Sequence, residues 1–191
     1  RYNPLPNFNV APTHRCPVIT NADSGHIQLY KWGLIPSWSK DEKMAYNMIN
    51  ARVESLVEKK TFTKLLESQR CIVPMDGFYE WKKKGKDKTP YRIQTTDQEI
   101  FSVAGLFDLW KDSKGEIVHT YTIITLPANS FMSQIHDRMP AILNKNDEVL
   151  WIDNTLKHDE HLQLLQPYND DQLCMYEVSS KVGNVRENDA S

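Results

Sequence analysis

A series of short apolar segments between residues 70 and 125, separated by polar turns, constrains the fold of this chain more than any other feature. Two of the connections, Lys84-Gly85-Lys86-Asp87 and Asp112-Ser113-Lys114-Gly115, carry the glycine that a tight turn favours. Apolar runs of this length between turn residues predict β-strands, and short connections favour antiparallel pairing. The predicted strands are Arg70–Val73, Phe78–Lys82, Pro90–Gln94, Ile100–Leu106 and Thr120–Thr125.

Shorter elements flank this β-rich section. Leu56, Phe62 and Leu66 fall loosely at helical spacing, which predicts one or two short amphipathic helices between residues 52 and 67. Four prolines before residue 18 predict an irregular start with only a short strand at Phe8–Val10. The other predicted elements are strands at Ile27–Trp32 and Cys174–Val178 and short helices at Asn129–Ile135, Asn146–Asp153 and His158–Leu165. Together they predict an α+β fold, a curved or barrel-like antiparallel sheet with peripheral helices.

Composition places bounds on organisation and compartment. A chain of 191 residues, 40% of them hydrophobic, fits one domain over residues 1–191 and can build a sizeable core. The sequence contains no apolar stretch of the length that spans a bilayer, so we expect no membrane partner. Cys16, Cys71 and Cys174 are odd in number and far apart, which favours a reducing compartment over a disulfide or zinc framework. We expect a monomer in the cytoplasm, associated with the nucleoid in a bacterium.

The balance of charge limits how the chain could bind nucleic acid. Its formal net charge is −2, whereas binding by bulk electrostatics depends on many Lys and Arg side chains neutralising phosphates. A protein that coats nucleic acid is therefore excluded. Any nucleic-acid site has to be a local basic groove on an otherwise acidic surface.

Asn50 and Arg52 form the first candidate site. They lie two residues apart, so an extended segment would place the amide and the guanidinium on one side, where both could face a ligand. The alternative is a helix start in which Asn50 is the N-cap and Glu54 lies in the first turn. The residues alone leave both interpretations open.

Glu80 is the second candidate, a single carboxylate inside the aromatic segment Gly77-Phe78-Tyr79-Glu80-Trp81. Burial in such a strand would raise its pKa and suit it to proton transfer. The alternative is a strand with Glu80 on its wet face.

His136 and Arg138 form the third candidate, after the predicted helix that ends at Ile135. Histidine titrates closest to neutral pH, and arginine can bind a phosphate with two hydrogen bonds. The alternative is that both side chains only complement the dipole of a helix end.

Other motifs favour ordinary surface roles. Residues 82–88, Lys-Lys-Lys-Gly-Lys-Asp-Lys, could follow a nucleic acid but are also typical of a solvated hairpin tip. His158 and His161 have helical spacing but no accompanying ligands, so no metal is predicted. No phosphate-binding glycine loop is present, and no cofactor is predicted.

Six sequence blocks, in this order, resemble those of the SOS response-associated peptidase (SRAP) family. They are Phe8-Asn9-Val10-Ala11-Pro12, Trp32-Gly33-Leu34-Ile35-Pro36-Ser37-Trp38, Asn50-Ala51-Arg52-Val53-Glu54, Gly77-Phe78-Tyr79-Glu80-Trp81, His136-Asp137-Arg138-Met139-Pro140 and Val182-Gly183-Asn184-Val185. Any one block alone is a weak signal. Their order along most of the chain makes the resemblance specific.

The resemblance implies a protein that binds single-stranded DNA and covalently captures abasic sites. Family members expose an N-terminal cysteine by removing their own initiator methionine, and its amine and thiol close a thiazolidine on the abasic aldehyde. The resemblance assigns Glu80 to proton transfer at that amine, His136 to opening of the sugar and Asn50 to holding the N-terminal residue or the adduct. It implies that Arg52 and Arg138 bind phosphates and that Trp38 stacks on a base.

The start of the chain fits this resemblance only in part. Arg1-Tyr2 resembles the end of the family's Met-Cys-Gly-Arg opening, so we expect the catalytic cysteine ahead of Arg1 in the complete protein, and further residues between Tyr2 and Asn3. Arg1 itself is a candidate phosphate ligand. Two other functions use the same residues. One is a peptidase that acts on other proteins, and the other is a non-catalytic binder of single-stranded nucleic acid that uses Trp38, Arg52 and Arg138.

Overall fold

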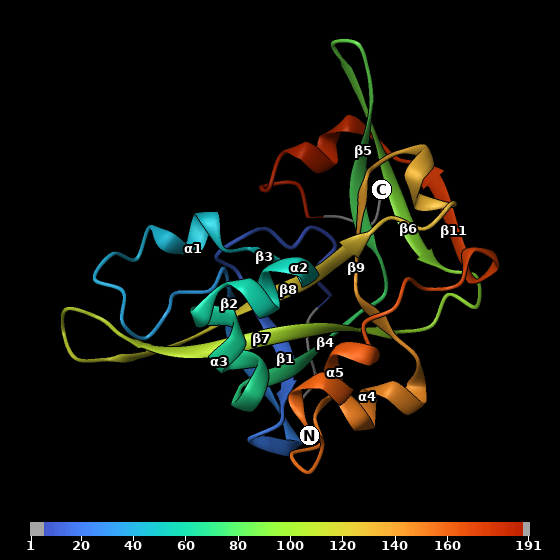
Figure 1. Ribbon diagram of the computed structural model, residues 1–191. Coiled ribbons are helices and arrows are strands. Elements are labelled where there is room, and N and C mark those ends of the chain that lie inside the picture. Colours follow the sequence, from blue (N-terminus) through green and yellow to red (C-terminus); the bar gives the residue numbers. More distant parts are fainter. Residues whose placement is uncertain (1–5, 189–191) are drawn as a thin grey trace.

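The computed structural model describes residues 6–188, and a closed five-stranded β-barrel forms its centre (Figure 1). The ring runs in the order β4, β7, β8, β2, β1 and back to β4. All neighbours are antiparallel except β2 and β8, which run parallel. The barrel strands are β1 (Arg15–Thr20), β2 (Asp23–Trp32), β4 (Arg70–Met75), β7 (Phe101–Lys111) and β8 (Ile117–Pro127).

Short strands extend the barrel wall, and a second sheet lies beside it. Along β8, Thr125 pairs with Arg52 of β3 (Asn50–Arg52) on one edge and with Pro140 of β9 (Arg138–Pro140) on the other. The remaining barrel extension, β10 (Ile142–Leu143), pairs with β7. The second sheet has the order β11 (Leu173–Glu177), β6 (Asp87–Thr95) and β5 (Phe78–Lys84). The β5–β6 hairpin projects beyond the rest of the fold (Figure 1).

Short helices cover the outside of the barrel. Phe62, Leu65 and Leu66 form the buried side of α3 and pack into the main core with barrel residues such as Leu106 and Ile124. None of the helices in residues 6–188 is long and apolar enough to cross a membrane. The helices are α1 (Met44–Asn47), α2 (Val53–Glu58), α3 (Lys60–Ser68), α4 (Lys145–Trp151) and α5 (His158–Gln163), with 3₁₀ turns at Met132–Gln134, Asp170–Gln172 and Ser180–Gly183.

The predicted α+β class with a barrel-like sheet is confirmed, and so are the predicted strands of the middle section. The strand β1 was not predicted, because Pro17 lies inside it. The strand tolerates this proline because β1 pairs with β4 only at Ile19 and Thr20, so no ladder bond to β4 is lost at Pro17.

Two local predictions are wrong. Phe8–Val10 is a bend rather than a strand, because the side-chain amide of Asn9 donates to the carbonyls of Val182, Asn184 and Glu187. The predicted helix Asn129–Ile135 is only the 3₁₀ turn Met132–Gln134, so His136 does not end an α-helix. A helix dipole therefore gives no account of His136.

Candidate active site

Glu80 and His136 lie far apart in sequence, and the fold brings them together. Glu80 comes from β5 of the small sheet, and His136 comes from the loop before β9 of the barrel. Their nearest atoms, Glu80 Oε2 and His136 Nε2, are 4.0 Å apart, longer than a hydrogen bond. A small polar group of a ligand could therefore bridge the carboxylate and the imidazole.

Glu80 is partly buried, as one of the two interpretations of its sequence requires. Tyr91 lies opposite it across the β5–β6 ladder, and 25% of the Glu80 side chain is exposed. Burial is the largest influence on this carboxyl and raises its pKa above the ordinary value, while the neighbouring His136 opposes the rise. A carboxyl with a raised pKa can accept and return a proton closer to neutral pH.

The loop around His136 offers a partner to both protonation states of the imidazole. The backbone N–H of Arg138 donates to Nδ1 at 3.0 Å, which places the proton of a neutral ring on Nε2, the atom that faces Glu80. When Nδ1 is protonated it can instead donate to the Arg138 carbonyl at 3.2 Å or approach Asp137 Oδ1 at 3.4 Å. The ring can therefore change its hydrogen-bonding pattern without leaving its place in the loop.

Asn50 and Arg52 occupy the extended arrangement and not the helix cap. Both side chains are exposed on one side of β3 while Ala51 between them is buried, and the N-cap of α2 is Arg52, which makes no side-chain cap bond. β3 and β9 flank β8 at Thr125. Two strand spacings therefore separate the Asn50 segment from the His136–Arg138 segment, roughly 10 Å.

Trp38, Asn50 and Arg52 line one hollow of about 430 Å³. Its apolar side includes Met44, Met48 and Phe62, and its polar side includes Asn47, Ser55 and Lys59. Trp38 lies in the loop between β2 and α1, and 65% of it is exposed. An exposed indole beside an amide and two cationic side chains can stack on a flat ring and bind a nearby phosphate.

Arg138 is already engaged by the protein. Its guanidinium donates to both carboxylate oxygens of Glu54, at 2.8 and 3.0 Å, and to the carbonyl of Thr125. Its side chain is 14% exposed. The predicted phosphate contact stays a prediction, since a phosphate would have to share or replace Glu54. The other predicted phosphate ligand, Arg1, lies outside the described residues.

Sequence reasoning missed the residues that hold these segments in place. Asn9 joins the first and last blocks, and the hydroxyl of Tyr79, next to Glu80 on β5, donates to the Phe8 carbonyl at 2.8 Å. This contact places the start of the described chain against β5. Only the position of Asn9 inside a recognisable block could have suggested its role.

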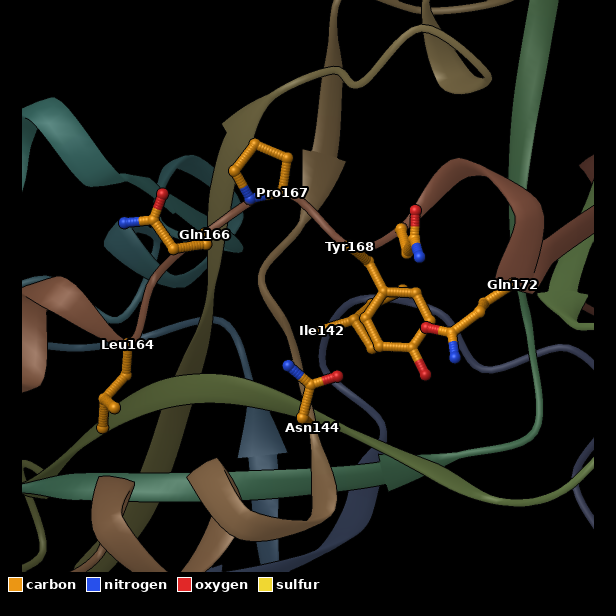
Figure 2. Close-up of a pocket in the computed structure, with 8 residues that line it drawn as sticks. Ile142, Asn144, Leu164, Gln166, Pro167, Tyr168 and Gln172 are labelled. Carbon is orange, nitrogen blue, oxygen red and sulfur yellow. The ribbon is translucent and has the colours of Figure 1, made fainter.

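A second hollow of about 310 Å³ contains none of the predicted site residues (Figure 2). Amide side chains and the ring of Tyr168 line it, together with Ile142 of β10. Residues 164–172, which form much of the wall of this hollow, also support the loop that leads to His136. Asn129 donates to the Tyr168 carbonyl at 2.8 Å, and the N–H of Phe131 donates to Asp170 Oδ1 at 3.2 Å.

The raised pKa of Glu80 predicts a dependence of stability on pH. The protonated carboxyl suits its partly buried position, so this contribution to stability is present below the ordinary glutamate range and is lost as the pH rises through the raised pKa. We expect Glu80→Gln to be more stable than the wild type at pH 8, with a difference that shrinks towards pH 4. Urea unfolding at both pH values measures this, and a Glu80→Gln variant less stable at pH 8 would contradict it.

The fold and the site define an α+β barrel protein that has a carboxylate–imidazole pair. Beside its strand β3 it also has a hollow lined in part by Trp38. The chain belongs to the SOS response associated peptidase (SRAP) family, whose model matches residues 1–185. The family resemblance of the six blocks is thereby confirmed.

Named relatives and a solved structure agree with this assignment. The chain is 45% identical over 186 residues to "Abasic site processing protein YoqW" of Bacillus subtilis, covering 96% of this chain and 83% of that protein. It is 34% identical over 216 residues to "Abasic site processing protein HMCES" of Xenopus tropicalis, covering 96% of this chain and 64% of that protein. A crystal structure of a protein from Bacteroides thetaiotaomicron matches with a TM-score of 0.82 and 37% identity, covering 88% and 75% of the two chains.

Proposed function

We propose that this protein processes abasic sites in DNA, and that it captures them covalently in single strands. The observation that carries the proposal is the approach of Glu80 to His136, two groups suited to proton transfer. The strand β3, which holds Asn50 and Arg52, lies about two strand spacings from the His136–Arg138 segment. The names of the relatives support DNA with abasic sites as the partner. These names specify neither single-stranded DNA nor a covalent step, so the proposal adds both.

The proposed reaction uses a cysteine at the mature N-terminus. Its α-amine attacks the aldehyde of the opened sugar, and loss of one water leaves an imine. The thiol then adds to the imine carbon, its proton passes to the nitrogen, and a thiazolidine ring closes. Because one residue supplies both nucleophiles, the second step is intramolecular.

We place this cysteine ahead of Arg1 in the complete protein, exposed when the protein removes its own initiator methionine. The cysteines of the chain do not fit the role, because none of them carries a free α-amine. Burial also raises the pKa of the Cys16 and Cys71 thiols, which lowers their thiolate content. The Tyr79–Phe8 contact supports an N-terminal nucleophile, since it holds the start of the described chain against the strand that carries Glu80.

Each site residue has a stated task in this reaction. Glu80 takes a proton from the attacking amine, and His136 donates a proton to the ring oxygen as the sugar opens. Asn50 holds the N-terminal residue or the adduct by its amide. Trp38 stacks on a base beside the lesion, and Arg52 and Arg138 bind the flanking phosphates.

A crosslinking experiment tests the proposal. Full-length protein, shown by intact mass to begin with cysteine, is incubated with a single-stranded oligonucleotide that carries one abasic site. We expect a denaturation-resistant adduct whose mass is the sum of the two reactants less one water, and a duplex abasic substrate should react less. If no adduct forms although the cysteine leads the chain, covalent capture is wrong.

A cleavage assay and a binding assay on the same protein distinguish the two rival functions. A peptidase that acts on other proteins would cleave unrelated polypeptides and not only its own initiator methionine. A non-catalytic binder would give salt-sensitive binding without an adduct, and its binding would be unchanged in Glu80→Ala and His136→Ala variants.

A further inference from the structure

We propose that the β5–β6 hairpin is a second nucleic-acid contact, which binds phosphates of the lesion-carrying strand where it continues beyond the active site. This inference rests on the proposed function. The surface that would bind these phosphates is the basic face of the hairpin, defined by Lys82 and Lys84.

The register of the hairpin places this basic face on the same side as the catalytic carboxylate. Alternate residues of a strand point the same way, so Glu80, Lys82 and Lys84 follow one another along one face of β5. Successive residues of such a row are about 6.7 Å apart. One nucleotide of a stacked strand advances about 3.4 Å, so the two lysines can reach different phosphates of a strand that leaves Glu80 along the hairpin.

The charge of this segment is concentrated, whereas the rest of the chain is acidic. Residues 82–88 contain five lysines and one aspartate, a charge of +4, so the remainder of a chain with net charge −2 carries −6. All seven residues are exposed. Among the ion pairs of residues 6–188, none involves a lysine of this hairpin. Five lysines and a single aspartate on a projecting element (Figure 1) fit a polyanion.

Folding alone does not favour this arrangement. Lys83 lies directly opposite Lys88 in the ladder, and like charges in that position destabilise a strand pair. Lys84 is the only lysine of β5 that faces an acid, Asp87. One other role exists for lysines here, because β5 is the edge of its sheet, and lysines on an edge strand discourage pairing with other chains. The two roles differ in which lysines they need. Edge protection can use lysines on either face of β5, whereas the proposed nucleic-acid contact needs those on the Glu80 face.

Two double variants with the same loss of charge make the test. Lys82→Gln with Lys84→Gln removes the cations on the Glu80 face, and Lys83→Gln with Lys88→Gln removes two from the opposite face. The ligand is a single strand of about 20 nucleotides with a central tetrahydrofuran abasic analogue. It has no aldehyde, so fluorescence anisotropy reports binding independently of covalent capture. A strand of about five nucleotides with the same analogue is the short control.

We expect Lys82→Gln/Lys84→Gln to weaken binding of the long strand about tenfold and to lower the slope of log affinity against log salt by about 1.4, the value for two single-strand phosphate contacts. Binding of the short strand should stay the same, as should both affinities of Lys83→Gln/Lys88→Gln. Equal losses in the two variants would overturn a contact specific to one face. Unchanged affinity, with self-association of Lys82→Gln/Lys84→Gln in sedimentation, would assign the lysines to edge protection and also overturn it.

The two proposals fail in different ways. If covalent capture is wrong, the wild type forms no adduct with aldehyde-bearing DNA, and the anisotropy measurement is unaffected. If the hairpin contact is wrong, adducts form normally, and the two double variants bind the long analogue strand alike.

Discussion

His136→Ala should slow adduct formation on single-stranded abasic DNA by about 10²–10⁴-fold, the usual contribution of a positioned acid–base group. The ring directs Nε2 towards Glu80 and has a backbone partner at Nδ1 in either protonation state. Glu80→Gln removes the other half of the pair and should slow the reaction by a similar factor. Single-turnover gel assays with excess protein measure both rates.

Binding and stability measurements separate chemistry from misfolding in these variants. Both should bind a strand with the tetrahydrofuran analogue within about twofold of the wild type, because neither residue is assigned a phosphate. His26→Ala and Glu116→Gln are matched controls, since both side chains are exposed and lie outside the site. Wild-type rates in His136→Ala would remove this residue from the mechanism.

The double variant adds a second constraint. Groups that act as one unit lose most of their effect on the first substitution, so Glu80→Gln/His136→Ala should be little slower than either single variant. Fully additive losses would show that the two groups contribute independently, and they would contradict the coupling that the 4.0 Å approach indicates.

Arg70→Ala should destabilise the fold by about 3–5 kcal/mol, the largest effect on stability that we expect from a single substitution. Arg70 is 1% exposed, and its guanidinium bridges the C-terminal ends of α3 and α4. It donates to the carbonyls of Leu66 and Glu67 at 2.8 Å and to that of Trp151 at 2.8 Å. Alanine would leave these buried acceptors without a donor and open a cavity.

Urea unfolding measures this loss. Lys64→Ala is the control, because Lys64 is exposed on α3, one of the two helices that Arg70 bridges. This substitution should change the free energy of unfolding by less than about 0.5 kcal/mol. Arg70→Lys should recover only part of the loss, since an ammonium group has three donors and cannot reproduce the planar fork. A change below about 1 kcal/mol in Arg70→Ala would contradict the assigned role.

Local patterns predicted much of the fold because local physics decides them. The strands from Arg70 to Thr125 follow from β-branched and aromatic runs between turn residues. The strand β1 and the bend at Asn9 could not be predicted this way. Pro17 is tolerated only where β1 lacks its β4 partner, and Asn9 is held by carbonyls more than 170 residues away in sequence.

By itself, the sequence determined the α+β class, the family and the candidate residues, because strand patterns and ordered blocks are properties of neighbouring residues. Only the tertiary structure decided between the alternatives at each candidate. Pairing with β8 makes Asn50–Arg52 extended. Tertiary packing also leaves Glu80 only partly exposed and places Arg138 in an ion pair with Glu54. Burial, pKa and the approach of Glu80 to His136 arise from contacts between segments distant in sequence, which no local pattern encodes.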